Sequence, residues 1–149
     1  LGASRLHRIS PVTDLLHMEA ALAHARQMVQ QQLTNLHAKA DARWLLVGGT
    51  GTALMGLIKG RLLPTGSPDE AFTIHEALAV LHQLTALSPE ERSALPGMMP
   101  GREHILPTGL CILVALMEQL DIPMAHVTTR NNTDGFLFEL YRERERGHG

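Results

Sequence analysis

The chain has 149 residues, of which 44% are hydrophobic, and its 13 Lys and Arg nearly balance its 15 Asp and Glu. This length and composition fit one globular domain, and the near-zero net charge excludes a strongly basic nucleic-acid-binding surface. Cys111 stands alone, which excludes a disulfide framework, and no apolar run reaches the about 18 residues of a membrane-spanning helix. We therefore expect a cytoplasmic protein that binds neither DNA nor membrane.

The first long pattern follows a half-apolar opening stretch, LGASRLHRIS, for which we expect a strand. Between Asp14 and Ala40, apolar residues recur at steps of three or four, which predicts one long amphipathic helix. Thr13 is the expected N-cap, since Asp14 would then lie in the first turn beside unpaired N–H groups. The apolar stripe consists of Leu15, Met18, Leu22, Ala25, Val29, Leu33, Leu36 and Ala40.

A strand, a glycine-rich turn and a second helix come next. The continuous apolar run Trp44–Val47 ends at Gly48 and is typical of a strand covered on both faces in a parallel sheet. The helix begins at about Thr50, continues to Lys59 and stops at Gly60. The turn, GGTGT, suits a ligand that touches the backbone, because the first N–H groups of a helix attract anions. A tight turn used only for packing explains the glycines equally well.

Two familiar phosphate-binding motifs do not fit this turn. A Walker loop needs lysine where Leu57 stands, and a Rossmann fingerprint needs glycine where Leu54 stands. Only the general physics of a helix start beside small residues remains.

The middle of the chain contains two helix starts. Thr73 with Glu76, and Ser88 with Glu91, match the capping-box pattern. Each predicts a helix, and Pro89 suits the first position of the second one.

The last third is dominated by residues 102–120, which are apolar almost all round and predict a buried helix that bends or begins near Pro107. A second strand is expected at 126–129 and a final helix at 135–141. Because two strands rarely make an independent sheet, we expect the chain to be a fragment of something larger.

Three segments carry a family resemblance: GGTGTALMGLIKG, SPEERSALPGMMPGREHILPTGLCIL and HVTTRNNTDGFLFELY. Together with the LGASRL start, they resemble the exopolyphosphatase and guanosine pentaphosphate phosphatase family (Ppx/GppA) in order and spacing. The resemblance implies the two-domain fold of actin, sugar kinases and heat-shock ATPases, with the active site between two ribonuclease-H-like domains. Residues 1–149 would be one α/β, helix-rich domain with a small mixed-sheet remnant, most of the second domain. The first domain and the phosphate loop D-x-G-G-G-S-x-E would lie outside the chain.

The resemblance also implies a function. Members of the family release terminal phosphate from inorganic polyphosphate or guanosine pentaphosphate with a divalent metal such as Mg²⁺. The residues expected near the phosphates or nucleotide are Gly48, Gly49, Thr50, Gly51, Thr52 and Arg102. A guanidinium suits this role, because it stays charged and offers phosphate a planar fork of donors.

The chain alone is expected to hold no catalytic residue and no metal ion, to be inactive, and to form a homodimer through its uncovered edge. Three alternatives stay open. The protein could be a non-catalytic sensor of guanosine tetraphosphate or polyphosphate, an acetate- or sugar-kinase-like ATP-binding domain, or a helical interaction module.

Overall fold

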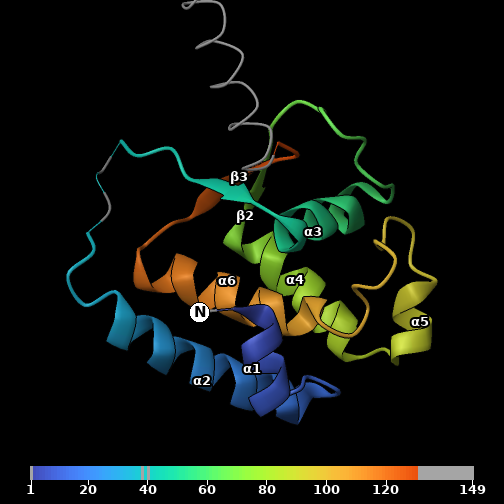
Figure 1. Ribbon diagram of the computed structural model, residues 1–149, viewed down its shortest axis with the longest axis horizontal. Helices are drawn as coiled ribbons and strands as arrows, with labels where there is room; N and C mark the ends of the chain where they lie inside the picture. Colours follow the sequence, from blue (N-terminus) through green and yellow to red (C-terminus); the bar gives the residue numbers. More distant parts are fainter. Residues whose placement is uncertain (1, 38, 40, 131–149) are drawn as a thin grey trace, which may run out of the picture.

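The computed structural model describes residues 2–37, 39 and 41–130. In chain order the elements are α1 (Ala3–Ile9), α2 (Leu15–Gln32), β1 (Leu45–Val47), α3 (Gly49–Lys59), β2 (Glu70–Thr73), α4 (Ile74–Thr85), α5 (Pro89–Ser93), α6 (Leu106–Gln119) and β3 (Met124–Thr128). Figure 1 shows the strands gathered on one side of the molecule, with α1 and α2 on the opposite side. The expected final helix at 135–141 lies outside the described residues.

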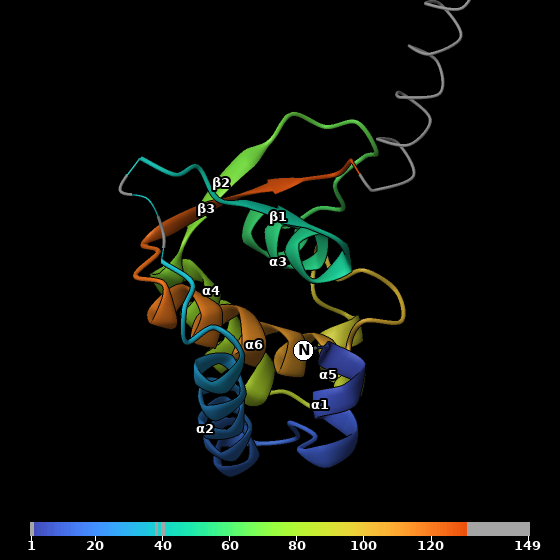
Figure 2. The same cartoon turned by 60° about the vertical axis from the view of Figure 1, so that its left-hand side comes forward.

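One mixed sheet contains all three of these strands, in the order β1–β3–β2. β1 runs parallel to β3, with Leu46 opposite Val127, and β2 runs antiparallel to β3, with Phe72 opposite Ala125. These four side chains share one face of the sheet, since strand residues alternate between faces. Figure 2 shows α3 directly beneath this sheet and α6 beyond it. The predicted helix-rich α/β class with a small mixed sheet is confirmed.

Helix α6 forms the centre of the core. It contacts α1, α2, α3 and α4, and its residues are buried on nearly every side. Pro107 lies in its first turn, so the helix begins where the sequence predicts. Both capping boxes, at Thr73 with Glu76 and at Ser88 with Glu91, are also confirmed.

The N-terminal stretch is a helix, so the predicted strand is wrong. Leu6 of α1 is fully buried, and the ring of His7 lies 3.2 Å from the hydroxyl of Thr108 in α6. The stretch therefore packs on the central helix α6 as a helix and not as a strand. Its two basic residues in the last turn, His7 and Arg8, also suit the negative end of a helix.

Helix α2 differs from its prediction at both ends. Its N-cap is Asp14, which accepts a hydrogen bond from the His17 N–H, whereas the Thr13 hydroxyl contacts the His17 ring. The helix ends at Gln32, well before Ala40. The Thr34 hydroxyl donates to the carbonyl of Gln30 at 2.9 Å and so satisfies one of the terminal carbonyls.

The strand predictions need two corrections. The sequence does not predict strand β2, because its segment EAFT has a single large apolar residue, Phe72, and shows no apolar run. The prediction that β1 is covered on both faces is wrong, because β1 is an edge strand whose Leu45 and Val47 are 50% and 46% exposed. Only Leu46 points from β1 toward the helices.

Cys111 lies at the centre of α6, and burial raises the pKa of its thiol from 9.0 to about 12. The unfolded chain would ionise this thiol near pH 9, whereas the folded chain does so only near pH 12. We therefore expect the free energy of unfolding to fall between these pH values by ~1.4 kcal/mol per pH unit. A Cys111→Ala variant should lose stability less steeply over the same range.

Iodoacetamide should modify Cys111 only after unfolding, and rapid alkylation of the native chain at pH 8 would contradict this.

Candidate phosphate-binding site

The turn between β1 and α3 leaves the first amides of the helix free. Gly48 is the N-cap and has φ 110°, a conformation that glycine adopts without strain. The Thr52 N–H donates to the Gly48 carbonyl at 3.2 Å and closes the first turn of the helix. The N–H groups of Gly49, Thr50 and Gly51 precede this bond and have no partner within the helix. They carry the partial positive charge of the helix start.

The glycines of this turn serve two purposes. A Cβ at Gly51 would lie 2.8 Å from the Leu46 side chain, so this glycine is needed for packing of α3 against β1. Gly48 is exposed, and Gly49 and Thr50 are only partly buried. The packing interpretation therefore holds for Gly51, whereas Gly48, Gly49 and Thr50 remain accessible to solvent.

Gly49 and Thr50 line a concavity of about 210 Å³. Its other walls come from the start of α1, from β1 and from α6, through Gly2, Ala3, Leu46, Val47, Gly109, Ile112, Leu113 and Leu116. The first turn of α3 is thus accessible, not sealed beneath side chains.

The segment between α5 and α6 carries Arg102 to the same turn. A Cβ placed on Gly49 would lie 2.5 Å from Cζ of Arg102, so the guanidinium rests directly on the backbone of Gly49. Arg102 is half-buried, and within residues 2–37, 39 and 41–130 its guanidinium forms no hydrogen bond or ion pair. The predicted site residues of the turn and Arg102 therefore lie together, and the guanidinium, which carries five N–H donors, lies beside the start of the helix.

Two residues that the sequence did not single out hold the Arg102 segment. Gly97 lies against the backbone of Gly56 in α3, and the buried Arg92 donates to the carbonyl of Glu103 at 3.3 Å. In the sequence, Gly97 is recognisable only as part of the turn-rich segment LPGMMPGR, and Arg92 only as an arginine in a short predicted helix.

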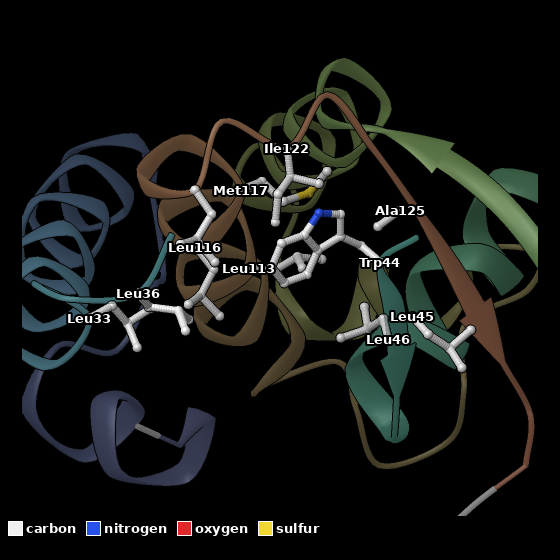
Figure 3. A pocket seen from close by; sticks show the side chains of 11 residues that line it. Leu33, Leu36, Trp44, Leu45, Leu46, Leu113, Leu116, Met117, Ile122 and Ala125 are labelled. Carbon is white, nitrogen blue, oxygen red and sulfur yellow. The ribbon is translucent and has the colours of Figure 1, made fainter. Parts of the chain in front are cut away.

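A second concavity, of about 280 Å³, lies beneath the free edge of β1 (Figure 3). Its walls are almost wholly apolar and consist of Leu33, Leu36, Trp44, Leu45, Leu46, Leu113, Leu116, Met117, Leu120, Ile122 and Ala125. Figure 3 shows the indole of Trp44, the residue before β1, facing this space. Such a lining suits apolar side chains and not phosphate.

The described residues contain no cluster of metal ligands. Nowhere in the described ranges do three His, Cys, Asp or Glu side chains gather closely enough to hold a metal.

None of the described helices has the length and apolar content needed to cross a membrane.

Fold and site define a helix-rich α/β domain whose strand–turn–helix unit presents free amides beside an arginine. The sequence model of the Ppx/GppA phosphatase family matches residues 1–143. The chain belongs to this family, which confirms the resemblance found in its motifs.

Solved structures support the same fold. An exopolyphosphatase-like protein matches with a TM-score of 0.81 at 16% identity, over 96% of this chain and 49% of its own. A Ppx/GppA family member from Aquifex aeolicus matches with a TM-score of 0.78 at 17% identity, over 95% of this chain and 47% of its own. An exopolyphosphatase from Cytophaga hutchinsonii matches with a TM-score of 0.72 at 14% identity, over 94% of this chain and 47% of its own. This chain therefore spans about half the length of these proteins. No curated protein sequence matches it.

Proposed function

We propose that residues 1–149 form most of the second domain of a two-domain cytoplasmic phosphatase and supply one wall of its active-site cleft. The substrate would be inorganic polyphosphate or guanosine pentaphosphate, cleaved at a terminal phosphoanhydride bond. Family membership and the half-length match to solved relatives support this proposal. The observation that carries it is the guanidinium of Arg102 lying on the first turn of α3.

The chemistry follows from where negative charge builds up. In phosphoryl transfer the protein acts mainly by positioning and by stabilising charge on the phosphate oxygens. The free amides at Gly49–Gly51 and the fork of Arg102 are donors of this kind. No described carboxylate lies in this group, so the base that activates water and the ligands of Mg²⁺ would come from the first domain and the phosphate loop. The isolated chain is therefore expected to be inactive.

An Arg102→Ala variant of the parent protein should release phosphate from long-chain polyphosphate about 10²-fold more slowly, the typical loss when one donor to a developing oxyanion is removed. Arg43→Ala is the control, because Arg43 is an arginine that pairs with Asp69 away from the glycine turn. Turnover that Arg102→Ala leaves unchanged would remove this residue from the site.

We further propose that the isolated chain forms a homodimer in which the free edges of β1 pair. An edge strand presents unpaired N–H and C=O groups, and two identical edges can pair antiparallel about a twofold axis. Leu45 and Val47, which are about half exposed, would then gain neighbours on the added strand. Light scattering should give twice the chain mass of 16.3 kDa, and a monomer at high concentration would contradict the proposal.

A further inference from the structure

Arg92 is the largest fully buried side chain of the described part of the molecule, with 1% exposure. It forms no ion pair with a carboxylate among the described residues. Its three nitrogens donate instead to backbone carbonyls, from Nε to Leu84 at 2.6 Å, from Nη1 to Glu103 at 3.3 Å and from Nη2 to Val12 at 3.5 Å. A buried cation with every nitrogen bonded to the main chain has a defined structural purpose.

These three carbonyls belong to segments far apart in the sequence. Leu84 lies in the last turn of α4, where the helix dipole favours a cation. Val12 lies in the connection between α1 and α2, and Glu103 directly follows Arg102. Arg92 thus joins the helical core to the backbone of the segment that reaches the glycine turn.

We infer that Arg92 is a positioning residue for Arg102, which it holds in place against the first turn of α3. The inference rests on the function proposed above. Only the two soft dihedral angles of Glu103 separate its carbonyl from the rigid peptide that begins at the Cα of Arg102, so holding that carbonyl restricts where the Arg102 Cα can lie. A displacement of 1 Å at such a group is enough to weaken an interaction that depends on orientation. Lysine cannot replace Arg92 here, because its single nitrogen cannot reach three carbonyls in a planar fork.

A double-mutant cycle separates this positioning role from a merely stabilising one. Tripolyphosphate is titrated calorimetrically into the wild-type chain, Arg92→Lys, Arg102→Met and the double variant, all below the lowest unfolding temperature. Each single substitution should weaken binding about tenfold, which is ~1.4 kcal/mol. The double variant should be no weaker than Arg102→Met alone, because Arg92 acts through Arg102. A Val29→Ala variant, which opens the core at α2, controls for loss of stability and should bind normally.

The outcomes distinguish the two proposals. Unchanged binding by Arg102→Met, or no binding by the wild type, would overturn the proposed function and this inference with it. A loss with Arg102→Met but wild-type affinity in folded Arg92→Lys would overturn the inference alone. So would a further tenfold loss in the double variant.

If Arg92→Lys does not fold, hydrogen exchange in the wild-type chain gives the answer. The Arg102 N–H donates to the Met99 carbonyl at 3.1 Å. An anchored segment should release this amide proton as slowly as the amides of α6 exchange. Exchange several orders of magnitude faster, as in an exposed loop, would overturn the inference.

Discussion

A Gly97→Ala substitution is expected to lower the free energy of unfolding by roughly 2–5 kcal/mol. Gly97 has φ 87°, where an alanine is strained by roughly 1–2 kcal/mol. Its Cβ would also overlap the carbonyl of Gly56 in α3, and a Cβ on Gly56 would in turn lie 2.6 Å from the Gly97 carbonyl. Two backbones meet here, so no side chain can rotate away, and overpacking of this kind costs roughly 1–3 kcal/mol more. Urea denaturation measures the loss.

Gly101→Ala is the matched control for this prediction. Gly101 lies in the same segment with φ 77°, but nothing lies within 4 Å of its missing Cβ. Only the backbone strain of roughly 1–2 kcal/mol should appear. Equal losses in the two variants would show that the contact between Gly97 and Gly56 contributes nothing to stability.

A Gly49→Ala substitution should weaken tripolyphosphate binding about tenfold while the chain stays folded. The new Cβ would occupy the place of the Arg102 guanidinium, which is the flexible end of a long side chain and can move away. Stability should be unchanged or slightly raised, because alanine is more favourable than glycine in a helix by roughly 0.5–1 kcal/mol. The hydrogen bonds lost to a charged group are worth roughly 1.5–3 kcal/mol each, which supports a tenfold change.

Gly2→Ala is the control for that experiment. Gly2 lines the same concavity as Gly49, but its missing Cβ has no neighbour within 4 Å. Binding should therefore match the wild type. Wild-type affinity in Gly49→Ala itself would mean that the guanidinium does not contribute from this position.

Local signals in the sequence were enough to predict several elements. Capping boxes at Thr73 and Ser88 depend on residues three apart, so they can be recognised without knowing the fold. The start of α6 follows from Pro107, and the stop of α3 follows from Gly60, which adopts a left-handed conformation. The region of Gly48 was recognised for the same reason, because helix-start amides and small residues are properties of a short stretch.

Features that depend on distant partners could not be predicted in this way. β2 exists because β3 pairs with it, and its sequence EAFT carries no pattern of its own. The opening stretch became a helix because it packs on α6. The association of Arg102 with Gly49 came only from the family resemblance. The contacts of Arg92 with Val12 and of Gly97 with Gly56 join residues far apart in the chain, so no local pattern predicts them.

Nuclear magnetic resonance of the 149-residue chain during a tripolyphosphate titration tests the phosphate-binding wall most directly. The amide signals of Gly49, Thr50 and Gly51 and the side-chain Nε–H signal of Arg102 should shift together and saturate at one common dissociation constant. If these signals stay unchanged while other basic side chains respond, the first turn of α3 and Arg102 do not form an anion site.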